Sequence, residues 1–287
     1  MRVLISGAHG QVGHELMRLA PAGFELLGLG SGELDITSAE QVATVLAQFQ
    51  PQLIINAAAY TAVDKAESDA ERAYAVNRDG VAYLARAGVP LLHISTDYVF
   101  AGDAQHPYGE CDATGPSGVY GASKLAGEQA LTEANDQHII LRTAWVFGAH
   151  GHNFVKTMLR LGRERETLSV VADQQGCPTS AASIARALWA LAGQYVESGE
   201  LKWGIYHYSG APACSWHDFA LEIFRQAHER KLLARIPQVT PITTADYPTP
   251  ARRPAWSVLD CSKLQRAHGI TQADWQTELG QVLRELA

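Results

Sequence analysis

A glycine-rich segment near the N-terminus is the feature that most constrains the fold. The segment Gly7-Ala8-His9-Gly10-Gln11-Val12-Gly13 follows an apolar run at residues 3–6. Glycines at a strand–helix junction permit a tight turn and a close approach of the backbone to a pyrophosphate, which the helix N-terminus also favours. The pattern is weak by itself, but its place at the first strand–helix junction indicates a dinucleotide-binding βαβ unit.

The rest of the first 150 residues repeats this alternation. Short apolar runs predict buried parallel strands, and stretches rich in Ala, Leu, Glu and Gln between them predict helices, one of them capped by Ser38. We therefore expect an α/β fold with a Rossmann-type, doubly wound parallel sheet. The predicted strands are 3–6, 25–29, 53–56, 91–95 and 138–142, and the predicted helices are 10–19, 39–49 and 67–87.

After residue 150 the alternation is less regular. Patterns there predict a helix at 153–166, a strand at 168–171 and a helix at 183–191, while the proline-rich residues 237–256 predict an ordered loop near a site and no long regular element. We expect a dinucleotide-binding domain at 1–150, with 172–200 packing back on it. Residues 151–171 and 201–287 would form a smaller, partly irregular C-terminal substrate lobe.

Composition excludes several classes of protein. The net charge of −7 without a Lys/Arg tract argues against a nucleic-acid or acidic-membrane partner. Neither a secretory signal nor a transmembrane helix is expected. The four cysteines are far apart, which argues against structural zinc and required disulfides. These features predict a reduced, cytoplasmic protein.

Three polar residues form a candidate catalytic group. Thr96 follows a buried strand at the end where α/β sheets bind ligands. Tyr120 and Lys124 share one face if a helix begins there. An ammonium near a phenol lowers its pKa from about 10, which makes tyrosine a better general acid near neutral pH. The Thr96 hydroxyl would then contact the same substrate oxygen.

The sequence leaves the type of dinucleotide open. The predicted second strand ends without an acidic residue at its tip, and Glu33 and Asp35 follow slightly later. No Lys or Arg lies between Arg18 and Lys65, which argues against a strong clamp for a 2′-phosphate. We expect relaxed preference for NADPH or NADH, with Asp35 near the adenosine end.

Longer segments carry a family resemblance. Together they resemble the extended short-chain dehydrogenase/reductase family, and within it the branch that reduces a nucleotide-linked 4-dehydro sugar. The resemblance implies NAD(P)H-dependent reduction of the C4 ketone of dTDP-4-dehydro-L-rhamnose to dTDP-L-rhamnose, the last step of dTDP-L-rhamnose synthesis for cell-surface polysaccharides. The segments span nearly the whole chain and include GAHGQVGHEL (7–16), NAAAYTAVDKAE (56–67), STDYVFAG (95–102), VYGASKLAGE (119–128), RTAWVFG (142–148), NFVKTMLRL (153–161), TLSVVADQQGCPT (167–179), GIYHYSG (204–210), SWHDFA (215–220) and YPTPARRPAWSVLD (247–260).

The resemblance also implies roles for individual residues. Thr96, Tyr120 and Lys124 would be catalytic, and Asn77 would lie near the nicotinamide. Residues lining the cofactor would be Gly7, Gly10, Gln11, Val12, Asp35, Ala57, Ala58, Ala59, Tyr120 and Lys124. Residues facing the substrate would be Thr61, Val63, Thr96, Asp97, Tyr98, Trp145 and Asn153, and Arg253 suits its pyrophosphate.

Several of these assignments have an alternative. Trp145 is either an apolar wall for the deoxy-sugar or a core residue, and Asp97 either contacts substrate or only orients Thr96. Arg253 is either a phosphate ligand or a surface residue. Arg142 fits a structural arginine and is not assigned to the site.

A metal is not expected. The resemblance includes relatives that form dimers through a metal held by acidic residues, with a glutamate at the position of Glu15. Here residues 180–183 read Ser-Ala-Ala-Ser and lack the carboxylates that such a cluster needs, so Glu15 is expected on a helix surface. A homodimer remains compatible with the resemblance.

Two other functions fit the same fold. One is a nucleotide-sugar epimerase or dehydratase, and the other is a non-catalytic dinucleotide-binding regulatory subunit. Dehydratases usually carry an extra acidic residue where this chain has Tyr98, which favours plain reduction. The joint presence of Thr96, Tyr120 and Lys124 favours an enzyme over a binding subunit.

Overall fold

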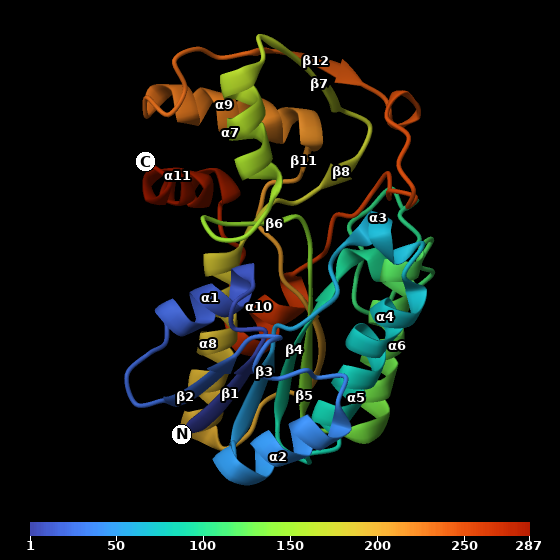
Figure 1. The fold of residues 1–287 in the computed structure, drawn as a ribbon, viewed down its shortest axis with the longest axis vertical. Coiled ribbons are helices and arrows are strands. Elements are labelled where there is room, and N and C mark those ends of the chain that lie inside the picture. Colours follow the sequence, from blue (N-terminus) through green and yellow to red (C-terminus); the bar gives the residue numbers. More distant parts are fainter.

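Six short strands form one parallel sheet of the Rossmann type, and the sequence predicts five of them. The computed structural model describes all 287 residues and places this sheet between two layers of helices (Figure 1). The chain crosses from one half of the sheet to the other after its second strand, so the strand order reverses between the first and third strands. In spatial order the strands are β10 (Gly204–His207), β5 (His138–Thr143), β4 (Leu91–Thr96), β3 (Leu53–Asn56), β1 (Arg2–Ser6) and β2 (Glu25–Leu29).

Both faces of the sheet are buried, which explains the continuous apolar runs of its strands. Successive residues of a strand point to opposite faces, so Val3 and Ile5 pack in one core cluster while Leu4 packs in another. The first cluster lies under α1 (Gln11–Arg18), α8 (Ala181–Ser198) and α10 (Ser262–His268). The second lies under α2 (Ala39–Phe49), α5 (Gly80–Ala85) and α6 (Val119–Ala134).

The single helix predicted at 67–87 is divided. The chain instead forms α3 (Val63–Ala66), α4 (Ala70–Tyr74), a π-helical turn at Ala75–Asp79 and then α5. This turn packs tightly on α6, because a Cβ added to Gly127 would lie 1.9 Å from the Asn77 carbonyl oxygen. The wider π-helical turn therefore places Asn77 against α6. This contact between helices cannot be predicted from the periodicity of the sequence.

The C-terminal lobe has a separate core at the top of Figure 1. Aliphatic side chains pack there with several aromatic rings, and a capping box between Ser215 and Asp218 begins its α9. Its main elements are α7 (Phe154–Glu164), β7 (Thr167–Val171), α9 (Trp216–Glu229), β12 (Gln238–Ile242) and α11 (Trp275–Glu285). Short elements join the two parts: a 3-10 turn at Asp97–Val99, β6 (Val146–Phe147), β8 (Gln175–Gly176), β9 (Thr179–Ser180), β11 (Cys214–Ser215) and a 3-10 turn at Thr244–Asp246.

Two features of the lobe differ from the sequence expectation. Within the proline-rich residues 237–256, β12 pairs in parallel with β7 through its whole length. Pro241 is compatible with this strand because β12 has a neighbour on one side only. In addition, β10 pairs with β5, and Leu264 of α10 joins the core of the sheet. Residues 204–207 and 262–268 therefore belong to the sheet layers and not to the lobe in which the sequence placed them.

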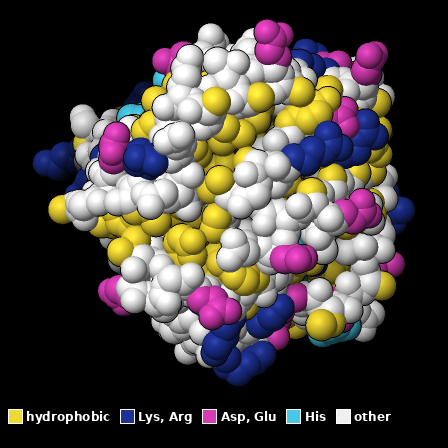
Figure 2. Space-filling view, turned by 90° about the horizontal axis from the view of Figure 1, so that it is seen from below, with side chains coloured by type: hydrophobic (Ala, Val, Ile, Leu, Met, Phe, Trp, Pro, Cys, Tyr) yellow, Lys and Arg dark blue, Asp and Glu magenta, His cyan; other side chains and the backbone are white.

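The surface carries mixed charge. On the face seen from below, Lys and Arg side chains alternate with Asp and Glu and with apolar atoms, and form no continuous basic area (Figure 2). The longest helices also lack an apolar stretch of the length needed to cross a membrane.

A buried ion pair attaches α6 to the sheet. Arg142 of β5 donates from Nη2 to Glu128 Oε2 at 2.6 Å and from Nε to Glu128 Oε1 at 2.9 Å. Ser95 of β4 donates to the same carboxylate at 2.5 Å. Both charged side chains are at most 3% exposed, and the guanidinium lies 5.0 Å from the Phe100 ring centroid. This arrangement satisfies most of the polar atoms, so the pair is tolerated in the core.

Breaking this pair should destabilise the protein strongly. Arg142→Met leaves the Glu128 carboxylate buried without its partner, and we expect a loss of about 3–5 kcal/mol in the free energy of unfolding, measured in urea. The double change Arg142→Met and Glu128→Met should restore most of that loss. Arg225→Met removes an exposed pair with Glu222 and should cost about 1 kcal/mol or less. Equal losses in the two single variants would contradict this account.

Candidate functional site

The glycine loop packs directly on the end of β3. Gly7 has a φ of 75°, and a Cβ there would lie 2.5 Å from the Ala58 nitrogen. A Cβ on Gly13 would lie 2.0 Å from the Gly7 carbonyl oxygen. Glycine is therefore required at both positions. The loop and Ala57–Ala59 meet where the strand order reverses, which is the usual place for a ligand in such sheets.

The residues at this place fit a bound dinucleotide. Gly10 is the N-cap of α1 and supplies no side-chain hydrogen bond, so the first N–H groups of the helix face outward. Gly10 is exposed and Gln11 is half-buried. Val12 is 8% exposed and packs in the sheet core, so it can line the cofactor only through its backbone.

The fold brings a basic residue to Asp35 that the sequence reasoning missed. Arg72 of α4 lies 3.7 Å from the Asp35 carboxylate and donates from Nη1 to the Thr37 hydroxyl at 3.2 Å. The Thr37 hydroxyl donates to Asp35 Oδ1 at 2.7 Å, and this bond is the main reason why the pKa of Asp35 is lowered. The absence of Lys and Arg between 18 and 65 is therefore weaker evidence against a 2′-phosphate than it first suggests, because α4 supplies a cation.

Thr96 and Asp97 form a buried pair at the carboxyl end of β4. The Thr96 hydroxyl donates to Asp97 Oδ1 at 2.9 Å and accepts from the Tyr98 N–H at 3.2 Å. The second Asp97 oxygen is buried without a partner. Burial raises the pKa of Asp97 to about 6, and the hydrogen bond from Thr96 and the nearby Ser257 hydroxyl oppose this shift. Ser257 lies in the C-terminal segment and was not predicted, because no local motif marks it.

Tyr120 and Lys124 lie on α6 as predicted, but Lys124 does not lower the pKa of the phenol. Burial raises the pKa of Tyr120 above its ordinary value, with the Thr96 hydroxyl opposing this shift. Lys124 Nζ instead donates to the Ile94 carbonyl at 2.7 Å. Burial lowers the pKa of Lys124 to about 8, while Glu128 opposes this shift. The sequence interpretation was therefore wrong on this point for the ligand-free site, since i,i+4 spacing places two side chains on one face without aiming them at each other.

Arg253 holds the proline-rich loop against α3. It donates from Nη1 to the Tyr98 hydroxyl at 3.2 Å and pairs from Nη2 with Asp64 at 2.5 Å. The other Asp64 oxygen accepts from the Ala251 N–H at 3.2 Å. Tyr98 in turn meets the Tyr120 ring edge-on, at 5.5 Å between centroids. The predicted ordered loop therefore lies beside Tyr120, and Asp64 is a connecting residue that the sequence reasoning missed.

Trp145 and Asn153 have structural partners in this arrangement. Trp145 has a φ of 46° and stacks on Trp216 at 3.6 Å, while a Cβ at Gly176 would lie 2.3 Å from its ring. Asn153 caps α7 and donates its amide hydrogens to Gln11 Oε1 at 2.9 Å and to the Gly148 carbonyl at 2.8 Å. Both residues join the lobe to the sheet, and their contact with substrate stays a prediction.

Asn77 and the β3–α3 loop support the same site. Asn77 donates to the Ser123 hydroxyl at 3.0 Å and exchanges hydrogen bonds with the Tyr60 backbone. This fixes the loop that carries Thr61, which is exposed, and Val63, the first residue of α3.

Glu15 is buried, at 3% exposed, and not on the helix surface as expected. With His150 and Glu285 it forms a group whose ligand atoms lie within 4.8 Å of one another. Arg18 pairs with Glu15 at 2.5 Å and lies 3.5 Å from Glu285. Both carboxylates therefore already have a cation beside them, and the absence of a metal stays a prediction.

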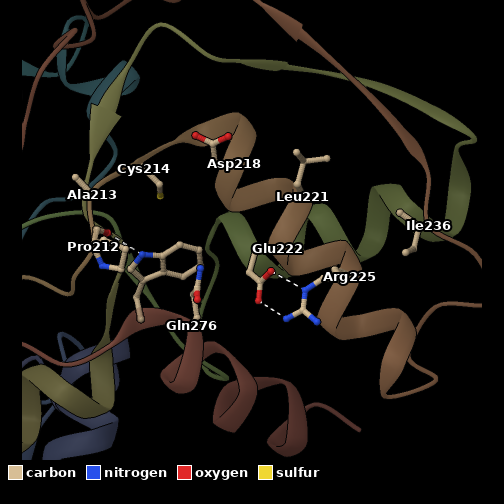
Figure 3. Close-up of a pocket in the computed structure, with 10 residues that line it drawn as sticks. Pro212, Ala213, Cys214, Asp218, Leu221, Glu222, Arg225, Ile236 and Gln276 are labelled. Carbon is tan, nitrogen blue, oxygen red and sulfur yellow. Dashed lines mark hydrogen bonds and ion pairs between the residues drawn. The ribbon is translucent and has the colours of Figure 1, made fainter.

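A separate cavity of about 540 Å³ lies in the lobe, between α9 and α11 (Figure 3). Leu221 and Ile236 line it, and so do Glu222 and Arg225, which form an ion pair with each other. None of the predicted site residues belongs to it, so it is distinct from the site around Tyr120.

Comparisons with known proteins agree with this geometry. The family model described as RmlD substrate binding domain matches residues 1–287. A protein of Aggregatibacter actinomycetemcomitans named dTDP-4-dehydrorhamnose reductase is 49% identical over 284 residues, which cover 97% of each chain.

Two solved structures are also similar over nearly their whole length. A dTDP-4-dehydrorhamnose reductase from Clostridium acetobutylicum has a TM-score of 0.92 and 38% identity, and covers 100% of this chain and 99% of its own. One from Bacillus anthracis, in complex with NADP, has a TM-score of 0.90 and 39% identity, and covers 99% of each chain.

The raised pKa of Asp97 predicts a pH-dependent stability. Between the ordinary pKa of 3.8 and the folded value of about 6, the unfolded chain ionises more readily, so native stability falls as pH rises through this window. Asp97→Asn lacks this penalty. Its stability relative to the native protein, measured by urea unfolding, should therefore improve from pH 4 to pH 7 by on the order of 3 kcal/mol.

Asp218→Asn provides a control of opposite sign. A hydrogen bond from the Ser215 hydroxyl lowers the pKa of Asp218, so this carboxylate stabilises the folded protein above its ordinary pKa. The control variant should lose stability relative to the native protein as pH rises. If Asp97→Asn also lost stability relative to the native protein as pH rises, the pKa of Asp97 would not be raised in the folded protein.

Proposed function

The chain belongs to the dTDP-4-dehydrorhamnose reductase family, and from this premise we propose that it reduces the C4 ketone of dTDP-4-dehydro-L-rhamnose to dTDP-L-rhamnose with NADPH or NADH. This is the last step of dTDP-L-rhamnose synthesis, and its product serves cell-surface polysaccharides.

One observation carries the proposal. The phenol of Tyr120 adjoins the Thr96 hydroxyl at the carboxyl end of β4, the strand next to β3, and the glycine loop packs on Ala57 and Ala58 just after β3. Two hydroxyls at this place suit a carbonyl oxygen on which negative charge develops. A dinucleotide on Gly7–Gly13 would extend along the same edge of the sheet.

The chain's own residues then have distinct tasks. A nicotinamide bound at the glycine loop would supply the hydride for the C4 carbon. Tyr120 donates its proton to the C4 oxygen, and Thr96 binds the same oxygen. The high pKa of the buried phenol keeps Tyr120 protonated until charge develops on the substrate. Lys124 lies one turn further along α6 and would hold the ribose hydroxyls of the cofactor.

The surroundings favour simple reduction. Position 98 is a tyrosine whose hydroxyl binds Arg253, so this place offers no second carboxylate for elimination or epimerisation. Arg253 reaches a substrate pyrophosphate by exchanging its pair with Asp64 for a bidentate contact with phosphate oxygens. Loop closure and substrate binding would therefore use the same side chain.

The cellular setting is part of the proposal. The four cysteines are free, which fits a reducing compartment, and we place the enzyme in the cytoplasm. A homodimer remains our prediction for the assembly, and light scattering of the purified protein would test it.

The activity predicts cofactor oxidation with a defined substrate. Purified protein should consume NADPH or NADH, followed by absorbance, when dTDP-4-dehydro-L-rhamnose is generated in situ by the upstream epimerase. UDP-linked sugars serve as a comparison for nucleotide preference. No oxidation of either cofactor, with the upstream enzymes shown to be active, would refute the reductase proposal.

Tyr120→Phe should separate proton transfer from binding. The variant should bind cofactor normally but lose about 10²–10⁴-fold in kcat, the usual contribution of general acid catalysis. Tyr98→Phe is the matched control, because its ring contacts Tyr120 and its hydroxyl binds Arg253. The control should mainly raise KM. A near-normal kcat for Tyr120→Phe would exclude Tyr120 as the proton donor.

A further inference from the structure

A chain of buried polar side chains runs across the sheet to Lys124 and is not part of the chemistry above. Ser6 of β1 donates to Asn56 Oδ1 at 2.7 Å. Asn56 Nδ2, at the end of β3, lies 3.0 Å from His93 Nδ1 on β4. His93 Nε2 lies 3.4 Å from Lys124 Nζ. Ser6, Asn56, His93 and Lys124 are each at most 2% exposed, so the direction of each hydrogen bond affects its neighbours.

The orientation of the Asn56 amide is fixed by the backbone. The Ala58 N–H donates to Asn56 Oδ1 at 3.0 Å. A backbone N–H can only donate, so the atom that faces Ala58 must be the oxygen. The amide nitrogen therefore faces His93, and it can only donate there.

This orientation determines the tautomer of His93. Because Asn56 Nδ2 donates, His93 Nδ1 must accept and carries no proton. The neutral ring then has its proton on Nε2. A doubly protonated ring is disfavoured, because its Nδ1–H would face the N–H of the Asn56 amide. Burial, with Lys124 on α6 and His138 on β5 nearby, also lowers the pKa of His93 well below its ordinary value.

The Nε2–H of His93 thus points toward Lys124. An ammonium group has only donors and repels another N–H, whereas a neutral amine has a lone pair that accepts from it. The other groups near Nζ act differently: the Ile94 carbonyl accepts from it in either state, and Glu128, on the next turn of α6, favours the ammonium.

We propose that His93 is a positioning residue whose Nε2–H, directed by Asn56, favours the neutral amine of Lys124. The neutral amine is the state that remains after Lys124 has given a proton to replace the one that Tyr120 passes to the C4 oxygen. His93 therefore makes Lys124 a better source of that replacement proton. The inference rests on the proposed function only in assigning Lys124 to the reacting site.

The tautomer is measured directly on native, cofactor-free protein. Two-bond ¹H–¹⁵N spectra of ¹⁵N-histidine-labelled protein distinguish a protonated from an unprotonated ring nitrogen, and the spectrum of His93→Gln identifies the His93 signals. We expect Nδ1 unprotonated and Nε2 protonated throughout pH 6–9. A proton on Nδ1, or titration of the ring within this range, overturns the proposal whether or not the protein is a reductase.

Two variants then test the effect on Lys124. The amide of His93→Gln can accept from Asn56 and donate to Lys124, so it keeps the direction of the hydrogen bonds, whereas His93→Met offers no donor. In ¹³C-lysine spectra of folded protein, we expect the pKa of Lys124 to rise by about one unit in His93→Met and to stay near the native value in His93→Gln. Thermal unfolding checks that each variant is folded.

The pH dependence of the reaction gives a second measurement. The alkaline decline in kcat/KM should move to higher pH in His93→Met and stay in place in His93→Gln. Equal pKa values for Lys124 in both variants and the native protein would reduce His93 to a packing role and overturn the inference. If the proposed substrate is not turned over, the two spectroscopic measurements still decide the question.

Discussion

The proposed site depends on one buried interaction, the ion pair between Glu128 of α6 and Arg142 of β5. Ser95 joins this pair one residue before Thr96, while Lys124 and Tyr120 lie one and two turns before Glu128 on the helix. The pair therefore fixes the Thr96 hydroxyl on β4 and the Tyr120 hydroxyl on α6 relative to each other. A buried pair of this kind adds little net stability compared with apolar residues, but it permits only one register of helix against strand. The pair thereby keeps the Tyr120 hydroxyl in a defined position, which matters because proton transfer needs hydrogen-bond contact with the substrate oxygen.

Local sequence patterns predicted the sheet well, for physical reasons. Parallel strands are buried on both faces, so their apolar runs are easy to recognise. Gly7 marks a turn that packs against Ala57 and Ala58 just after β3, and Gly13 packs on Gly7. Right-handed crossovers determine which face of the sheet each connecting helix covers, whereas the order of the strands is seen only in the structure. The sixth, β10, was missed because it is short and follows an excursion of the chain through the lobe. The division of 67–87 was missed because it depends on contact with Gly127 of α6.

The same distinction separates the predicted from the unpredicted parts of the site. Thr96, Tyr120 and Lys124 stand in short motifs, whereas His93, Asp64, Ser257 and Arg72 act through partners far away in the sequence. The direction in which Lys124 points shows the limit most clearly. Helical spacing places Lys124 and Tyr120 on one face, yet burial and the carbonyl of Ile94 draw the ammonium toward β4. Only the packed structure shows that the Ile94 carbonyl, and not the Tyr120 phenol, is the partner of the Lys124 ammonium.

The late return of the chain to the sheet has a consequence for biosynthesis. Until residues 204–207 leave the ribosome, the outer edge of β5 has no partner, although every strand on its other side is already available. An unpaired strand edge is a template for association with other chains. The nascent protein must therefore carry an open edge while α7, β7 and α8 are made, and a nascent chain that stops short of β10 would be prone to aggregation. The lobe thus delays closure of the sheet as well as covering its ligand-binding end.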